Sequence, residues 1–166
     1  MEIIIIAAAA ENRVIGKGNA IPWSIKEDTA RFRELTLGRS CIMGRKTWES
    51  LPKRPLPGRP NIVVSQTLAA EAAPGAEVFP SLEEALRHCA QDCAGREKIF
   101  ICGGASIYRE ALAFADKIEL TVIHKQYDGD VFFPEIDSDQ WVKTVSTDFD
   151  GFSFISYNRK NNDNTF

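Results

Sequence analysis

The start of the chain holds an uninterrupted apolar run, Ile3-Ile4-Ile5-Ile6 followed by four alanines. A strand with one exposed face alternates apolar and polar residues, whereas a continuous run of this length is typical of a strand buried on both faces. The run is far shorter than the ~20 residues that a membrane-spanning helix needs. Glu2 rather than a basic residue precedes it, which does not favour a signal peptide. We therefore expect a buried first strand over Ile3–Ala9.

Similar short runs recur along the chain and alternate with helical patterns. Further strands are expected at Ser40–Met43, Asn61–Ser65, Ile99–Cys102 and Ile118–His124, with a closing hairpin of Trp141–Thr147 and Phe152–Tyr157 around Asp150-Gly151. One helix is expected from the capping box Ser24–Glu27 to Gly38, and another from the capping box Ser81–Glu84 to near Gly95. A third is expected from about Ala105 to Phe114, and a short one begins near Arg45. This order predicts an α/β domain whose sheet is parallel in part and antiparallel at one edge.

Length, charge and cysteine content narrow the classes of protein that remain. The 166 residues suit one domain, which we place at residues 1–160 with a polar tail at 161–166. A net charge of -3 does not favour a nucleic-acid-binding surface, which would be basic. The four cysteines (Cys41, Cys89, Cys93 and Cys102) form no CxxC pair, and with two histidines they do not predict a metal site. A reduced, cytoplasmic protein is expected.

The first expected helix carries a carboxylate among apolar residues. Its inward face consists of Ile25, Asp28, Thr29, Phe32, Leu35 and Thr36, while Lys26, Glu27, Arg31 and Glu34 point away from it. An ionised carboxylate buried without a partner is costly, so Asp28 is a candidate functional residue. The alternative is a solvent-facing carboxylate that favours the positive N-terminal end of the helix.

Two strand-to-helix junctions are rich in glycine. The strand at Ile99–Cys102 runs into Gly103-Gly104-Ala105-Ser106, and the strand at Ser40–Met43 runs into Gly44-Arg45-Lys46-Thr47. Free N–H groups at a helix start bind anions, and two such starts suggest a dinucleotide. Tight turns are the alternative explanation for the glycines. The G-x-G-x-x-G signature is absent, and the glycine spacing before Lys46 is too long for a P-loop, which disfavours a nucleotide kinase.

Three basic residues are candidates for binding anions. Arg45 and Lys46 stand together at a helix start, where such a pair suits the 2′-phosphate of NADP. Arg59 follows a proline-rich loop and has the fork geometry that binds a carboxylate in two places. Each of the three is equally consistent with a solvated surface cation.

Several short motifs together resemble the dihydrofolate reductase family over nearly the whole chain, to about Tyr157. In chain order they are Val14-Ile15-Gly16, Ile21-Pro22-Trp23, Asp28, Gly44-Arg45-Lys46-Thr47, Arg54-Pro55-Leu56-Pro57-Gly58-Arg59, Cys102-Gly103-Gly104 and Gly129-Asp130. The resemblance implies a single domain with a central eight-stranded mixed sheet and four helices. It implies NADPH-dependent reduction of dihydrofolate to tetrahydrofolate, by hydride transfer to pterin C6 with protonation at N5.

The resemblance also implies a role for particular residues. Asp28, Trp23 and Thr121 would be catalytic, with Asp28 at the pterin's amidine edge and Trp23 holding a water. The remaining substrate-binding residues would be Ile6, Ala7, Phe32, Leu51, Leu56 and Arg59. The nicotinamide would meet Ala8, Ile15, Ala20, Cys102 and Tyr108; the 2′-phosphate would meet Arg45, Lys46, Ser65 and Gln66; and the pyrophosphate side would meet Gly44, Thr47, Gly103, Gly104, Ala105, Ser106 and Ile107.

Three further expectations follow from the same resemblance. The Gly103–Gly104 peptide is expected to be cis, and residues 10–24 are expected to form a lid over the nicotinamide. The partners would be dihydrofolate and antifolate inhibitors, and we expect a monomer that binds neither nucleic acid nor a membrane. The rival functions are a related reductase acting on a pyrimidine intermediate of riboflavin synthesis and a catalytically inactive binding protein. Asp28 after Ile21-Pro22-Trp23 favours the pterin, and the intact Trp23, Asp28 and Thr121 favour an active enzyme.

Overall fold

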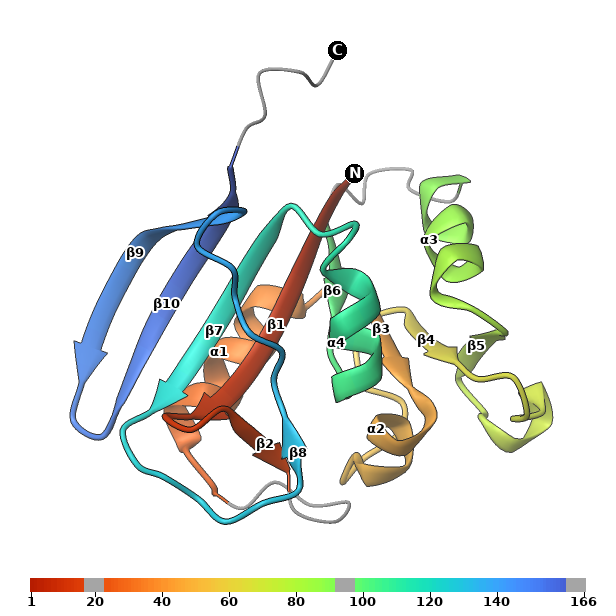
Figure 1. The fold of residues 1–166 in the computed structure, drawn as a ribbon. Coiled ribbons are helices and arrows are strands. Elements are labelled where there is room, and N and C mark those ends of the chain that lie inside the picture. Colours follow the sequence, from red (N-terminus) through yellow and green to blue (C-terminus); the bar gives the residue numbers. More distant parts are fainter. Residues whose placement is uncertain (17–22, 92–97, 161–166) are drawn as a thin grey trace.

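The computed structural model describes residues 1–16, 23–91 and 98–160 (Figure 1). In the described part, the strands are β1 (Glu2–Ala10), β2 (Val14–Gly16), β3 (Ser40–Gly44), β4 (Asn61–Val64), β5 (Ala76–Phe79), β6 (Lys98–Ile101), β7 (Lys117–Ile123), β8 (Val131–Phe132), β9 (Trp141–Phe149) and β10 (Phe152–Arg159). The helices there are α1 (Lys26–Thr36), α2 (Arg45–Ser50), α3 (Leu82–Gln91) and α4 (Ala105–Ala111), with a 3₁₀ turn η1 at Ala70–Ala72.

Eight of the strands form one sheet in the order β5-β4-β3-β6-β1-β7-β10-β9. The pairs from β5 through to β7 are parallel, and β10 and β9 complete one edge as an antiparallel hairpin that turns at Gly151. β1 lies inside the sheet, between β6 and β7. The predicted mixed sheet of eight strands and its antiparallel edge are therefore confirmed.

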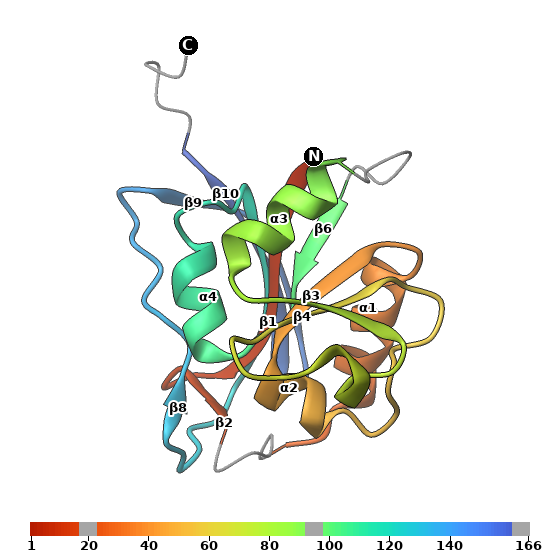
Figure 2. The same cartoon turned by 90° about the vertical axis from the view of Figure 1, so that its right-hand side faces the viewer.

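Helices cover both faces of the sheet, which explains the continuous apolar run of β1. Ile3 and Ile5 face α3 and α4, whereas Ile4 and Ile6 belong to the cluster on the opposite face, which includes Trp48 of α2. Figure 2 shows the sheet nearly edge-on, with α3 and α4 on one side and α1 on the other. Because the strands from β5 to β7 run the same way, their carboxyl ends meet at one edge, where parallel sheets commonly bind ligands.

One of the two expected helix caps is present. The Ser81 hydroxyl accepts a hydrogen bond from the Glu84 N–H at 3.1 Å, so the cap of α3 is confirmed. The cap expected from Ser24 is wrong, because α1 starts one residue later, with Ile25 at the N-cap and no side-chain cap. The expected end of α3 near Gly95 lies outside the described residues, as does the tail at 161–166.

Two residues of α1 were also assigned to the wrong face. Thr29 was expected to point inward but is exposed, and its hydroxyl donates to the Ile25 carbonyl. Arg31 was expected to point outward but forms an ion pair with Glu119 of β7. Arg31 lies beside the apolar stripe of α1, and from that position its long side chain can reach inward to an acidic residue on the sheet, here Glu119.

Strands β2, β5 and β8 were not identified from residue patterns, because they are short and lack a run of large apolar residues. β2 and β8 pair outside the main sheet. No helix in the part of the chain that the structure describes is long and apolar enough to cross a membrane.

The two serines provide a matched test of helix capping. Replacing Ser81 by Ala removes an acceptor for a first-turn N–H and should lower the free energy of unfolding by about 1 kcal/mol. Replacing Ser24 by Ala removes no cap, so the change should stay within about 0.5 kcal/mol. Urea unfolding of both variants measures the difference. Equal losses in the two proteins would contradict this assignment of the caps.

Candidate active site

The centre of the candidate site is a hydrogen bond between α1 and β7. Asp28 lies in the first turn of α1, and its Oδ1 accepts a hydrogen bond from the Thr121 hydroxyl at 2.7 Å. Thr121 is only 2% exposed, and in the register of the sheet it stands opposite Ala8 of β1. The carboxylate is therefore fixed near the carboxyl ends of the two central strands, as the inward-facing interpretation of Asp28 predicted.

Burial raises the pKa of Asp28 above its ordinary value, because the charged form loses hydration. The hydrogen bond from Thr121 and the positive charge of Arg31 act in the opposite direction but do not cancel the effect of burial. A half-buried carboxyl group with a raised pKa is a common feature of functional sites. The arrangement suits a group that accepts hydrogen bonds from a ligand while remaining able to carry charge.

Apolar side chains surround one side of this carboxylate. The cluster on the α1 face contains Ile6, with Phe32, Leu51, Leu56 and Cys102 packed against it. These five residues come from β1, α1, the end of α2, the following loop and the end of β6. Apolar side chains with a few polar groups among them are typical of sites that bind small molecules.

The neighbouring first-strand positions do not all face the same way. Ala7 belongs to the cluster on the α3 and α4 face, so its side chain points away from Ile6. The Ile6 carbonyl is bound from that other side, accepting a hydrogen bond from the Tyr108 hydroxyl at 2.8 Å. Tyr108 of α4 thereby holds the backbone of β1 in place beside the site.

Arg59 lies on the loop beyond the apolar wall. Its Nη1 donates to the Thr36 hydroxyl at 2.9 Å, and its Nε donates to the Pro57 carbonyl at 2.9 Å. Thr36 is buried at the end of α1, and its own hydroxyl donates to the Phe32 carbonyl at 2.7 Å. The guanidinium is thus anchored to the same helix that carries Asp28.

The two glycine-rich junctions lie side by side. The Gly44 N–H donates to the Gly103 carbonyl at 2.8 Å, which joins the end of β3 to the end of β6. Gly44 and Gly104 are the N-caps of α2 and α4, and neither helix has a side-chain cap. The Gly103–Gly104 peptide is cis, as expected. A Cβ on Gly103 would stand 3.3 Å from the oxygens of Thr47 and Tyr108, so the backbone there packs tightly.

This geometry fits a dinucleotide, because two adjacent helix starts offer first-turn N–H groups to anionic oxygens. Thr47 of α2 flanks the junction, as do the residues that open α4, namely Ala105, Ser106 and Ile107.

A basic patch borders α2. Lys46 is exposed, and Arg45 reaches the Thr67 hydroxyl at 3.3 Å and the Glu49 carboxylate at 3.4 Å. The Ser65 hydroxyl accepts the N–H groups of Thr67 and Leu68 at 3.3 and 3.1 Å, and Gln66 next to it is exposed. The four residues expected at the 2′-phosphate are thus carried by α2 and by the turn after β4, which the bond from Arg45 to Thr67 links.

Trp23 meets a different part of the chain. Its ring packs on Tyr127 with the centroids 5.3 Å apart, and Asn12 fixes Tyr127 by donating to its carbonyl at 2.8 Å. Tyr127 was not identified from the sequence. Ile15 packs against the α3 and α4 face of the core. Ala20, expected at the nicotinamide, lies outside the described residues, as does the middle part of the expected lid at 10–24, residues 17–22.

Arg31 and Glu119 were also missed by the sequence analysis. Glu119 is a buried carboxylate on β7, and its Oε2 lies 2.7 Å from Arg31 Nη2. The signal was available, since Glu119 is the lone acidic residue in the run from Ile118 to Ile123.

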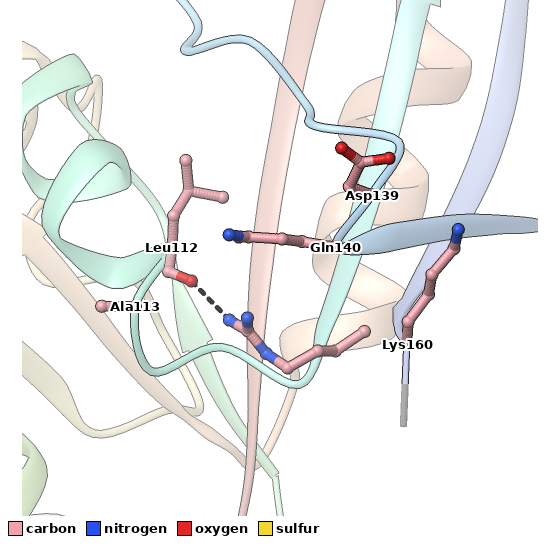
Figure 3. Close-up of a pocket in the computed structure, with 6 residues that line it drawn as sticks. Leu112, Ala113, Asp139, Gln140 and Lys160 are labelled. Carbon is pink, nitrogen blue, oxygen red and sulfur yellow. Dashed lines mark hydrogen bonds between the residues drawn. The ribbon is translucent and has the colours of Figure 1, made fainter. Parts of the chain in front are cut away.

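A pocket lies at the other end of the sheet, where β10 ends (Figure 3). There Arg159 donates to the Leu112 carbonyl and to the Ala115 carbonyl, which satisfies the C-terminal end of α4. The role of Arg159 is therefore structural. Among the described residues, no group of acidic, histidine and cysteine side chains could hold a metal ion.

Fold and site together define an α/β domain with two helix starts side by side at one edge of its sheet and a half-buried carboxylate near an apolar cluster. Comparison with known proteins gives the family. The dihydrofolate reductase family model matches residues 2–159. The chain is 48% identical over 163 residues to a dihydrofolate reductase of Neisseria gonorrhoeae, covering 95% of this chain and 98% of that protein. It is 40% identical over 168 residues to the Bacillus subtilis dihydrofolate reductase, covering 96% and 95%.

A third relative is dihydrofolate reductase HdrB of Haloferax volcanii, which is 39% identical over 166 residues, 96% of this chain and 84% of that protein. The chain belongs to the dihydrofolate reductase family. It is an oxidoreductase, and its family reduces dihydrofolate to tetrahydrofolate with a nicotinamide cofactor.

Replacing Thr121 by Val tests the central hydrogen bond. The variant keeps the shape of the side chain but removes the donor to a half-buried carboxylate, which should lower the free energy of unfolding at pH 7 by about 1.5–3 kcal/mol. The hydrogen bond favours the charged carboxylate, so the loss should shrink as Asp28 becomes protonated at acid pH. Urea unfolding between pH 4 and 7 measures this.

The control is Thr29→Val, the same change on the exposed side of α1. It should have little effect at either pH. A loss for the Thr121 variant that is constant with pH would show that the hydrogen bond does not depend on the charge of Asp28.

Proposed function

We propose that this enzyme transfers a hydride from NADPH to C6 of the pterin ring of 7,8-dihydrofolate, with protonation at N5. The observation that carries the proposal is the half-buried Asp28–Thr121 pair, in a domain that also has an apolar cluster on the α1 face and two adjacent helix starts without side-chain caps. A reduced pterin needs both features, because its ring is flat and one edge carries adjacent N–H donors. Asp28, Trp23 and Thr121 are the residues we assign to the catalytic centre.

The shape of the wall supports a folate rather than a bare pterin. Asp28 would accept the two hydrogen bonds of the amidine edge, Ile6 and Phe32 would flank the ring with their side chains, and Ala7, whose side chain faces the other way, would meet it through its backbone. Leu51 and Leu56 offer an aliphatic surface farther along the wall, where the benzoyl ring would pack. Arg59 stands beyond them and would bind the glutamate carboxylate bidentately.

The cofactor side is supported by backbone donors. The first-turn N–H groups of α2 and α4, with Gly44, Thr47, Gly103, Gly104, Ala105, Ser106 and Ile107, would hold the pyrophosphate. Arg45, Lys46, Ser65 and Gln66 would hold the 2′-phosphate, and Ala8, Ile15, Cys102 and Tyr108 would border the nicotinamide. When bound, the nicotinamide supplies the hydride.

Asp28 meets the amidine edge of the pterin, which is far from N5, so the proton for N5 would arrive through water. A water held near Trp23 would serve this path. The charge of Asp28 would stabilise the protonated pterin from a distance, in a site from which the apolar wall excludes bulk water. The role of the carboxylate is therefore electrostatic and orienting.

The remaining parts of the proposal concern the protein as a whole. We propose one catalytic domain over residues 1–160, a monomer in the cytoplasm, and antifolates as inhibitors that use the contacts of the pterin. The net charge of -3 does not favour binding to nucleic acid and is consistent with an enzyme that acts on a small molecule.

Cofactor preference tests the basic patch. A charge-assisted hydrogen bond contributes about 1.5–3 kcal/mol, so two of them should give NADPH roughly a hundredfold higher kcat/KM than NADH. Arg45→Leu should reduce kcat/KM for NADPH far more than for NADH, while Arg87→Leu, an exposed arginine on α3, should change neither. Equal kcat/KM for the two cofactors in the unaltered enzyme would contradict the 2′-phosphate assignment.

Asp28→Asn tests the carboxylate, because asparagine keeps its shape without the charge. The raised folded pKa means that Asp28 lowers stability increasingly as pH rises above the unfolded value of about 3.9. The variant should therefore be at least as stable as the unaltered enzyme at pH 7, with the gap closing near pH 3. Its kcat at pH 7 should fall strongly and recover in part at pH 5, where solvent protonates the substrate.

Urea unfolding and turnover from pH 5 to 8 on both proteins measure the two effects. Unaltered turnover of the Asn variant at pH 7 would remove Asp28 from the proposed mechanism. A variant that is both inactive and much less stable would show that Asp28 is mainly a structural residue.

A further inference from the structure

We propose that the ion pair between Arg31 and Glu119 is a positioning element for Asp28, one that holds α1 on β7 and sets the pH range in which the site works. For its effect on turnover, this inference rests on the function proposed above. For its effect on Asp28 itself, it rests on the contacts alone.

The Arg31–Glu119 pair joins α1 to β7 next to the Asp28–Thr121 contact, about one helical turn farther along α1. Arg31 follows Asp28 by three residues on α1, and Glu119 precedes Thr121 by two residues on β7, so each pair lies on one side of its element. Arg31 Nη2 lies 2.7 Å from Glu119 Oε2, and Thr121 Oγ1 lies 2.7 Å from Asp28 Oδ1. Two adjacent contacts fix both the distance and the rotation of the helix, which one contact cannot do.

Neighbouring residues hold the ion pair in a single geometry. Glu119 Oε2 also accepts a hydrogen bond from the Ser156 hydroxyl of β10 at 2.8 Å, and Lys117 Nζ lies 3.2 Å from its Oε1. The Arg31 guanidinium lies over the Phe154 ring, 4.2 Å from the centroid. The Arg31 side chain is 21% exposed and that of Glu119 is 8% exposed, so solvent screens this pair much less than a surface pair.

Few other charges face Asp28 in the described part of the chain. On α1 the nearby charge is Arg31, and on β7 it is Glu119 behind Arg31. The facing strand β1 contributes apolar residues, and Tyr108 of α4 is neutral, because burial raises its pKa well above the ordinary value. Lys117 contacts the other carboxylate oxygen of Glu119, Oε1. Of this group of charges, Arg31 is the one that lowers the pKa of Asp28, and Glu119 is the negative charge paired with Arg31.

Removing one member of the pair should shift the pKa of Asp28 in a direction that depends on which charge is lost. Without the positive charge of Arg31, protons bind more tightly to Asp28 and to a bound pterin. Without the negative charge of Glu119, Arg31 acts uncompensated and protons bind less tightly. A residue with a purely mechanical role would not give opposite signs.

The experiment compares Arg31→Met, Glu119→Gln, the double variant and Arg31→Lys with the unaltered protein. Carbon-13 NMR follows the titration of the Asp28 carboxyl, and turnover is measured against pH with saturating cofactor. The midpoints of both curves should rise by about half a pH unit for Arg31→Met and fall by about as much for Glu119→Gln. The double variant and Arg31→Lys should stay near the unaltered midpoints.

Glu83→Gln with Arg87→Met, which removes an exposed ion pair on α3, is the matched control and should move neither curve. Carboxyl midpoints that do not move, or that move the same way in both single variants, would overturn the proposal. If the Arg31→Met variant does not fold, a carboxyl midpoint in Glu119→Gln that equals that of the unaltered protein would also overturn the proposal. Opposite shifts of the carboxyl midpoint with no change in the turnover curve would support the positioning role while removing Asp28 from the proposed mechanism.

Discussion

The burial of β1 on both faces is the constraint from which the rest of the structure follows. Ile5 is fully buried, and its neighbours alternate between two separate apolar clusters, so the sheet must be covered on both sides. Parallel strands joined by helices meet this requirement. Their carboxyl ends then meet at one edge, where α2 and α4 begin after β3 and β6, whereas Arg59 of the candidate site lies on the loop before β4.

At that edge the protein keeps a carboxylate partly out of water, which lowers stability as soon as the group is charged. The structure limits this cost without removing it: Thr121 donates a hydrogen bond, and Arg31 supplies a positive charge that Glu119 in turn moderates. The pKa of Asp28 therefore remains raised. Full neutralisation by a close arginine would stabilise the free protein more, but it would also weaken the attraction of the carboxylate for a protonated pterin.

The sequence predicted the fold well wherever apolar periodicity was strong. β1 and β7 were found within one residue, because most of their side chains are buried. The final hairpin was found within two residues, although β9 is exposed apart from Trp141. β5 was missed, since Ala76–Phe79 is short and its strand is stabilised by pairing with β4 at the sheet edge rather than by its own composition. The false cap at Ser24 shows that a capping box is only a local preference, because α1 begins at Lys26 with Ile25 at its N-cap.

In the candidate site, the sequence reveals buried charged side chains more readily than it reveals their partners. Asp28 was found because a charge in an apolar stripe is anomalous, and Glu119 in an apolar strand is the same kind of anomaly. Each buried charge implies a partner, and the partner's position depends on how α1 crosses β7, which no one-dimensional pattern contains. Arg31 looked exposed because helical periodicity describes where Cβ points, not where a guanidinium several bonds away ends.

The edge of the sheet proposed to bind the cofactor is harder to predict from side chains, because its donors belong to the backbone. Its proposed donors are the first-turn N–H groups of α2 and α4, which follow Gly44 and Gly104, because the Gly44 N–H itself donates to the Gly103 carbonyl and joins the two junctions. Glycine carries no side chain to mark such a site, and here the familiar G-x-G-x-x-G spacing is absent, so the sequence could only suggest a site from two glycine-rich junctions. The proposed anion site is divided between these junctions, which are far apart in sequence and which the parallel pairing of β3 with β6 brings together.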